Sequence, residues 1–252
     1  MTTSGAQSSE AARPVNYFAT THWSTVLRAG GNDTTQGREA LARLCQTYWF
    51  PLYAFVRRQG YLPEDAKDLT QGFFERLPQQ QTLGNADPRR GRFRSFILGA
   101  MSHFLADERA KQRAQKRGGG QTVLSLDIFA AEQRLEQEPL DECSPEKNFD
   151  KRWATALLEV VLQELAAEYQ REGKAGLFDA LKLTLSGTRE TQPYAALAAT
   201  LGMNEGAVKV AVHRLRKRYR ELLHAEIAST VATEQEAQEE MRYLIEVLSG
   251  AD

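Results

Sequence analysis

The chain has 252 residues, of which 42% are hydrophobic and 26% charged, and its formal net charge is −1. This length suits one or two domains of ordinary size, and the apolar share is enough for buried cores. No run approaches the ~18 uninterrupted apolar residues of a membrane span. The polar opening, residues 1–14, lacks the apolar segment of a secretory signal. These features exclude a membrane-spanning protein and predict a globular one without membrane contact.

Cysteine usage points to a reducing compartment. The two cysteines, Cys45 and Cys143, are far apart and neither belongs to a CxxC pair. A zinc site or a disulfide framework is therefore not expected. This usage predicts a cytoplasmic protein.

Charge is unevenly distributed although the total is nearly balanced. Residues 89–117 hold many arginines and lysines but only two acids, Asp107 and Glu108, and residues 209–220 hold no acid at all. Residues 127–150 and the tail after Glu226 are acidic. Two basic islands separated by an acidic segment are typical of a protein with two surfaces for a polyanion, and solvated helix faces are the alternative.

Apolar residues recur at steps of three and four through most of the chain, the period of helices with one buried face. The pattern predicts helices over 41–55, from Pro63 to Leu77, over 91–116, from Phe149 to Tyr169 and over 178–185. No internal repeat and no alternating strand pattern is found. We therefore expect an all-α fold of two small helical domains on a tether, with a C-terminal amphipathic helix. The expected boundaries are a disordered N-terminus over 1–17, a first domain over 18–117, an acidic linker over 118–148, a second domain over 149–224 and an acidic extension over 225–252.

Residues 193–218 carry the pattern of a helix-turn-helix. Ala198 is the small residue needed where two helices cross, and Gly202 follows four positions later in the turn. Asn204 suits the N-cap of the second helix. Apolar residues that would pack this helix against the first recur at Val208, Val212 and Leu215.

The second helix of this motif would present a basic face to solvent. Such a face is what entry into the major groove of DNA requires, and an ordinary hairpin with a solubilising face is the alternative. The candidate DNA-binding residues on it are Lys209, His213, Arg214, Arg216, Lys217 and Arg220.

Residues 64–74, Glu-Asp-Ala-Lys-Asp-Leu-Thr-Gln-Gly-Phe-Phe, resemble the Asp-Ala-Glu-Asp-Leu-Thr-Gln signature of extracytoplasmic-function (ECF) sigma factors, members of the sigma-70 family. The resemblance extends from about Phe18 to Leu223. It implies a region 2-like first domain, which binds core RNA polymerase and the −10 promoter element, and a region 4-like second domain, which reads the −35 element. By position, Asp65, Asp68 and Gln71 would contact polymerase, and they lie off the predicted inner stripe.

Residues 93–97, Phe-Arg-Ser-Phe-Ile, resemble the family's aromatic segment that helps to open promoter DNA. An aromatic face stacks on any unpaired base, so Phe96 is a candidate base contact, with core packing as the alternative, whereas Phe93 is expected in the core. The residues that the resemblance assigns to this DNA are Arg92, Arg94, Phe96, His103, Lys111 and Arg113. His103 replaces the asparagine of many relatives, and the Leu-Pro…Arg signature that usually precedes the region 4 motif is missing.

The expected function is therefore promoter-specific transcription initiation with core RNA polymerase and promoter DNA as partners. It requires no catalysis, no cofactor and no metal, and the four histidines have no metal-ligand spacing. A stand-alone helix-turn-helix regulator is the alternative. A nucleic-acid enzyme is disfavoured because neither a phosphate-binding loop nor a His-Glu-x-x-His pair occurs. Control by an anti-sigma factor, by a kinase or by the C-terminal extension stays open.

The C-terminal extension combines an apolar stripe with many acids. The stripe consists of Met241, Leu244, Ile245 and Leu248. We weigh two roles for it: a further core helix of the second domain, or an acidic helix that folds over the basic face of 209–220 and masks DNA binding.

Overall fold

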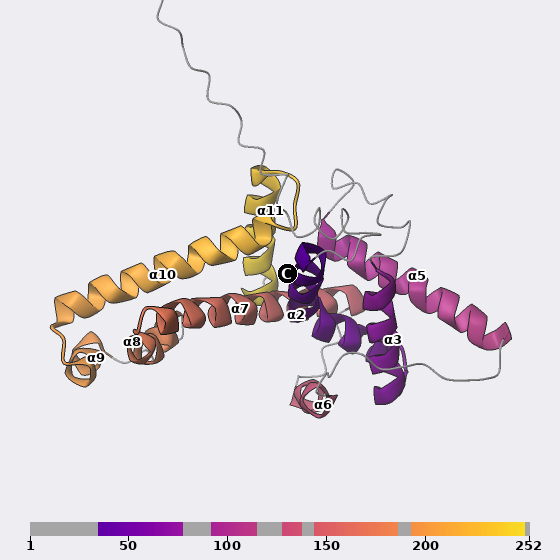
Figure 1. The fold of residues 1–252 in the computed structure, drawn as a ribbon, viewed down its shortest axis with the longest axis horizontal. Coiled ribbons are helices and arrows are strands. Elements are labelled where there is room, and N and C mark those ends of the chain that lie inside the picture. Colours follow the sequence, from indigo (N-terminus) through magenta and orange to yellow (C-terminus); the bar gives the residue numbers. More distant parts are fainter. Residues whose placement is uncertain (1–34, 78–91, 115–127, 138–143, 186–192, 250–252) are drawn as a thin grey trace, which may run out of the picture.

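A computed structural model describes residues 35–77, 92–114, 128–137, 144–185 and 193–249 (Figure 1). Within these ranges the chain is helical, without strands, which confirms the all-α prediction. The elements are α2 (Thr35–Arg58), α3 (Pro63–Arg76), α5 (Phe93–Ala114), α6 (Ile128–Gln137), α7 (Pro145–Arg171), α8 (Ala175–Leu181), the 3-10 turn η3 (Lys182–Leu185), α9 (Tyr194–Leu201), α10 (Glu205–Ala228) and α11 (Glu234–Ser249). The predicted N-terminal segment 1–17 lies outside the described residues.

The helix starts follow local chemistry. Pro63 occupies the first turn of α3, where its missing N–H costs no hydrogen bond, and Glu64 and Asp65 lie near the positive end of the helix dipole. The hydroxyl of Ser144 caps α7 by accepting a hydrogen bond from the Lys147 N–H at 3.2 Å. This cap places the start of α7 a few residues before the predicted boundary at 149.

The two predicted domains share a core. Helix α7 packs along α2, and Trp153 of α7 donates its indole N–H to the hydroxyl of Tyr48 on α2 at 3.1 Å. Phe149 and Trp153 are 1% and 2% exposed, within one hydrophobic cluster that continues into α10. The structure thus differs from two units on a tether, because the large aromatic residues at the start of α7 are buried against α2.

Part of the predicted linker is a docked helix. On α6, Glu132 accepts hydrogen bonds from Arg57 Nε at 2.7 Å and from the Tyr53 hydroxyl at 2.6 Å, both on α2. The hydrogen bond from Arg57 lowers the pKa of Glu132 against the opposing effect of burial. Arg134 lies 4.4 Å above the Phe50 ring centre. Residues 128–137 therefore extend the helical body that α2 and α3 form.

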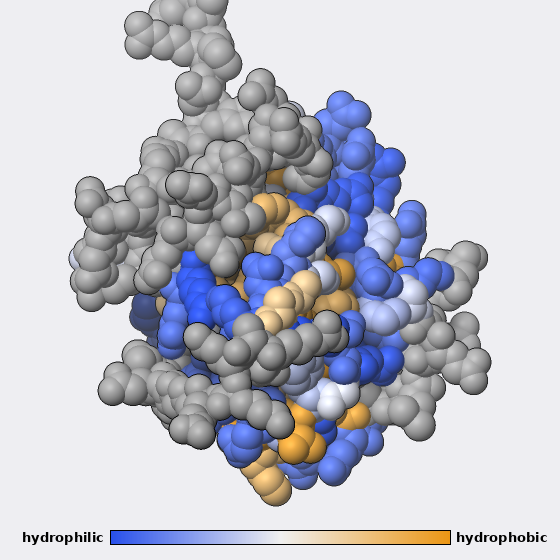
Figure 2. Space-filling view, turned by 90° about the vertical axis from the view of Figure 1, so that its right-hand side faces the viewer, coloured by the Kyte–Doolittle hydropathy of each residue, from blue (hydrophilic) through white to orange (hydrophobic). Residues whose placement is uncertain are grey.

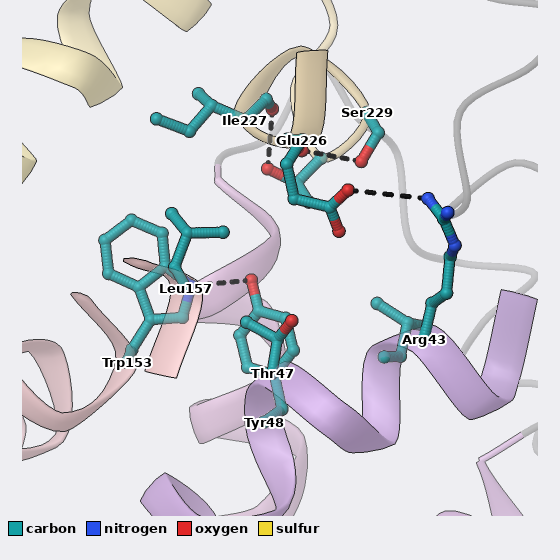
Figure 3. A pocket seen from close by; sticks show the side chains of 10 residues that line it. Arg43, Thr47, Tyr48, Trp153, Leu157, Glu226, Ile227 and Ser229 are labelled. Atoms are coloured by element: carbon teal, nitrogen blue, oxygen red, sulfur yellow. Dashed lines mark hydrogen bonds and ion pairs between the residues drawn. The ribbon is translucent and has the colours of Figure 1, made fainter. Parts of the chain in front are cut away.

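A small pocket lies where α2, α7 and α10 meet (Figure 3). Its lining includes Thr47, whose buried hydroxyl has no hydrogen-bond partner among the described residues. Glu226 of α10 also lines it, with Arg43 at 3.6 Å. Burial raises the pKa of Glu226, Arg43 lowers it to a smaller extent, and Glu164 adds a further rise. The ionised carboxylate of Glu226 therefore lowers the free energy of unfolding.

Replacing Glu226 with glutamine is expected to raise the free energy of unfolding at pH 7. Below the ordinary glutamate pKa of about 4.3, the carboxyl is protonated in both folded and unfolded chains and costs nothing. As pH rises through the raised folded pKa, it must ionise in place, and the native protein loses stability relative to the variant. Urea unfolding at pH 7 and at pH 4 measures this difference. Glu164→Gln removes the other acid near Arg43 and should give a smaller gain, because Glu164 only adds to the effect of burial on Glu226; an equal gain from both changes would contradict the account.

Candidate nucleic-acid interface

The predicted helix-turn-helix is present as α9, a short turn and α10. Gly202 ends α9 in the left-handed region with a φ of 62°, and the Met203 N–H returns to the Ala198 carbonyl at 3.0 Å. Such a positive φ favours glycine, which has no Cβ to clash. Asn204 then caps α10, because its side-chain oxygen accepts the Ala207 N–H at 2.7 Å. Both predictions for the turn are confirmed.

The inner face of α10 packs as expected. Val208, Val212 and Leu215 are 0%, 2% and 0% exposed, and Ala198 of α9 is buried in the same cluster. Further along, the Tyr219 hydroxyl donates to the Leu158 carbonyl of α7 at 3.4 Å. Buried apolar side chains thus fix which face of α10 is turned outward.

The outward face is basic and accessible. The predicted residues Lys209, His213, Arg214, Lys217 and Arg220 are all exposed. Lys209 pairs with Glu205 at 3.4 Å and Lys217 with Glu221 at 3.8 Å, both within the helix. Exposed pairs of this kind contribute ~0–1 kcal/mol, so these cations remain available to phosphate.

Two further exposed arginines of α10 also bond to the segments that support it. Arg216, a predicted DNA contact, donates from Nη2 and Nε to the Thr184 carbonyl of η3 at 2.8 and 3.2 Å. Arg218 donates to both oxygens of Glu168 on α7, at 2.6 and 2.8 Å, and this hydrogen bonding raises the pKa of Arg218. Arg216 is exposed although it is bonded to η3, and its contact with DNA stays a prediction.

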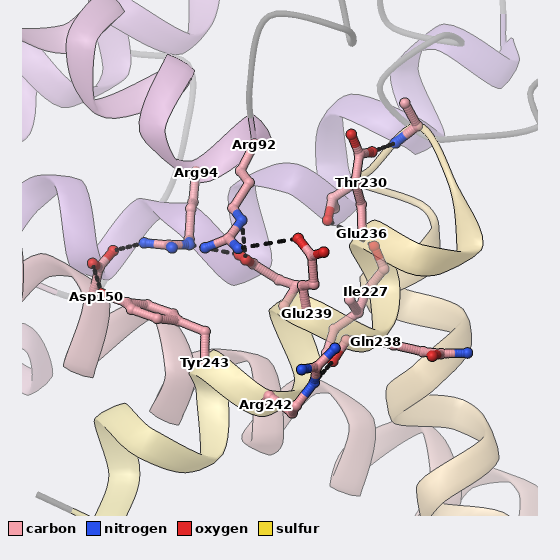
Figure 4. A network of polar contacts seen from close by, with 12 residues as sticks. Arg92, Arg94, Asp150, Ile227, Thr230, Glu236, Gln238, Glu239, Arg242 and Tyr243 are labelled. Atoms are coloured by element: carbon pink, nitrogen blue, oxygen red, sulfur yellow. Dashed lines mark hydrogen bonds and ion pairs between the residues drawn. The ribbon is translucent and has the colours of Figure 1, made fainter. Parts of the chain in front are cut away.

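In the basic island over 89–117, two arginines, Arg92 and Arg94, pair with acids of other helices (Figure 4). Arg94 is 7% exposed and donates to Asp150 of α7 at 2.6 Å and to Glu240 of α11 at 2.5 Å. It also lies 4.0 Å from the ring centre of Tyr243. The prediction that Arg94 contacts DNA is therefore wrong for this conformation, because acids distant in sequence enclose it. No local pattern identifies Asp150, Glu240 or Tyr243 as its partners.

Arg92 belongs to the same cluster but is more accessible, with 32% of its side chain exposed. Its Nε lies 3.0 Å from Glu240 Oε2, as an ion pair without the alignment of a hydrogen bond. Glu239 is 3.9 Å from its Nη2. The basic face of α10 is exposed, so the structure contradicts the idea that the C-terminal helix covers it; the acids of α11 reach Arg92 and Arg94 instead.

The remaining predicted residues of α5 divide between core and surface. Phe93 is buried against Tyr48, as expected, with ring centres 5.2 Å apart, and Phe96 is half-buried beside it at 6.2 Å. His103 and Lys111 are exposed, and Lys111 pairs with Glu108 at 3.0 Å. The side chain of Arg113 lies outside the described residues.

Helix α3 bears the predicted polymerase-contacting residues. Asp65 and Asp68 are exposed, whereas Gln71 is 4% exposed, so its predicted place on the surface is wrong. The physical reason is that α2, α5 and α6 all pack on α3, which buries a wider arc than one stripe. Figure 2 views the end of the molecule that carries α3 and α5, where hydrophilic residues predominate and apolar ones form small separate groups.

In the part of the chain that the structure describes, no helix has both the length and the apolar character needed to cross a bilayer. No group of three or more His, Cys, Asp or Glu side chains in those ranges could hold a metal ion. Comparison with known proteins finds no matching family model, no matching curated protein and no matching solved structure.

Proposed function

We propose that this chain is a sigma factor, which binds core RNA polymerase and directs promoter-specific initiation of transcription. The observation that carries the proposal is the exposed basic face of α10, held by a capped turn against α9. A second observation supports it: residues 64–74, which resemble the sigma-factor signature, lie on α3 with Asp65 and Asp68 exposed. The activity is binding and DNA opening, without covalent chemistry.

Helix α10 would read the upstream promoter element. Its first turns, together with α9, lie at the opposite end of the molecule from α3 and α5 (Figure 1). The N-terminal part of a recognition helix contacts base edges in the major groove. Lys209, His213 and Arg214 occupy that part and are exposed. Arginine pairs with guanine edges or phosphates, and lysine more often with phosphates.

The end of the molecule that carries α3 and α5 would bind polymerase and the downstream promoter element. Asp65 and Asp68 form an acidic surface for a basic partner, and His103 and Lys111 lie exposed on α5. Phe96 is half-buried, so the structure supports both the stacking and the packing alternative for its ring. The separation of the two ends suits a protein that holds two DNA elements at once.

Arg214→Ala is expected to weaken binding to a selected DNA site by about 1–3 kcal/mol if Arg214 contacts a base edge. The control is Arg218→Ala, one turn further along α10, because Arg218 is bound to Glu168. It should leave DNA affinity unchanged. Fluorescence anisotropy with duplexes selected from a random pool measures both. Equal losses for the two variants would contradict the assigned orientation of α10.

The proposed function is tested by mixing the purified chain with bacterial core polymerase freed of sigma factors. Co-elution in size-exclusion chromatography at low salt is expected. Intact DNA binding without a polymerase complex would contradict the sigma proposal and favour the stand-alone regulator.

A further inference from the structure

The acidic C-terminal helix occupies the basic island at the start of α5 (Figure 4). Glu240 of α11 is 2% exposed and faces two guanidinium groups, those of Arg92 and Arg94. These arginines and Glu240 are about half the chain apart, so the contact exists only because α11 folds back. The two guanidinium groups form an anion site, and the Glu240 carboxylate of the same chain fills it.

A carboxylate and a phosphate present the same feature to arginine, a pair of oxygens for charge-assisted hydrogen bonds. Glu240 Oε1 accepts a hydrogen bond from Arg94, its Oε2 forms an ion pair with Arg92, and Glu239 lies within 3.9 Å of Arg92. A nucleic-acid phosphate needs those same donors. The acids of α11 and a DNA backbone therefore compete for one site.

The attachment of α11 is limited. It packs against α10 and α7 with Ala237, Glu240 and Leu244 buried, while Met241 and Val247 are only partly buried against the core. Ile245 and Leu248 are 59% and 42% exposed. A terminal helix with few buried apolar contacts can open at a lower free energy than the whole fold.

The contacts that remain after opening keep the site basic. Tyr243 belongs to α11 and leaves with it. Its ring, which covers Arg94, and its hydroxyl, which donates to Asp150 Oδ2 at 2.6 Å, then no longer contact the site. Asp150 belongs to α7 and stays beside Arg94. Opening thus exposes Arg92 and Arg94 with Asp150 as the one remaining acid beside them. The resulting positive charge favours binding of an anion.

We propose that α11 is a displaceable strap, closed on Arg92 and Arg94 in the free chain and released when DNA phosphates bind at the start of α5. The inference rests on the proposed function, since it assigns those arginines to DNA. The basic face of α10 is open in the closed state, so the upstream element binds without rearrangement. DNA can bind the start of α5 only after α11 has dissociated from Arg92 and Arg94. Linkage makes the effect reciprocal, because whatever opens α11 also strengthens binding at this site.

Hydrogen exchange on the unmodified chain tests the release directly. The probe is a short DNA duplex with an unpaired stretch, at low salt, compared with the free chain. Amides of 234–249 should exchange about fivefold or more faster with DNA bound, while those of α7 should not. Unchanged or slower exchange in α11 would overturn the strap.

Charge removal provides the second test. Glu240→Gln keeps the shape of the side chain and is expected to raise affinity for the same probe by about 5- to 150-fold. Glu246→Gln removes the same charge from an exposed position on α11 and should change affinity little. Equal effects of the two changes would overturn the strap but leave the proposed function standing. Absence of DNA binding by every form would contradict both, and if Glu240→Gln misfolds, the exchange experiment on the native chain decides.

Discussion

Trp153→Ala is expected to lower the free energy of unfolding by about 3–5 kcal/mol. The indole is 2% exposed between α7 and α2, lies 5.4 Å from the Arg94 guanidinium, and donates to Tyr48. Its removal leaves a cavity between the two halves of the chain and a buried hydroxyl without its donor. Chemical denaturation followed by circular dichroism measures the loss.

Trp153→Phe is the matched control. It keeps an aromatic ring in the site but loses the N–H that reaches Tyr48, so a smaller loss of about 1 kcal/mol from the hydrogen bond is expected. Because α2 and α7 share one core, Trp153→Ala should shift a single transition. Two separate transitions, with only the one assigned to 144–249 shifted, would contradict the shared core.

Reversing charge at Asp65 and Asp68 is expected to weaken polymerase binding at least ~100-fold, or about 2.7 kcal/mol. Both side chains are exposed, so the double change Asp65→Arg with Asp68→Arg should leave folding intact. Like charges brought together at an interface cost several kcal/mol. A pull-down titration with core polymerase measures the loss.

Asp179→Arg provides the control for this prediction, because it makes one such reversal at an exposed position on α8, away from α3, and is compared with each single reversal on α3. It should leave polymerase affinity unchanged. Equal weakening by both variants would indicate a nonspecific charge effect and would remove α3 as the docking helix.

Helix positions and the inner stripe of α10 could be predicted because they depend on local periodicity. Val208, Val212 and Leu215 repeat with the helical period, and Gly202 and Asn204 are set by turn and cap chemistry. Each of these predictions needs only neighbouring residues. The helix-turn-helix was therefore accessible from the sequence.

The burial and the partners of individual arginine side chains could not be predicted in the same way. Arg94, Arg214 and Arg216 look alike in sequence, yet Arg94 is buried between helices, whereas the other two are exposed and Arg216 also bonds to η3. The difference arises from tertiary neighbours. Gln71 was misplaced for a related reason, since three helices pack around α3 and bury more than one stripe.

Two features lay beyond the patterns used. The helix α6 falls in an acidic segment that reads as a linker, and it is anchored by Glu132 to residues of α2. One of the two roles weighed for the C-terminal extension placed its acids over the basic face of α10, whereas Glu240 reaches the start of α5. Composition marks such segments as acidic but does not identify the basic side chain with which each acid will pair.

Transcription in vitro from a library of promoter fragments, with core polymerase alone and with the chain added, tests the central claim most directly. The account predicts that the chain confers defined start sites preceded by two shared sequence elements, and that Arg214→Ala weakens use of the upstream one. A polymerase that starts at the same positions with and without the chain would contradict the proposed function.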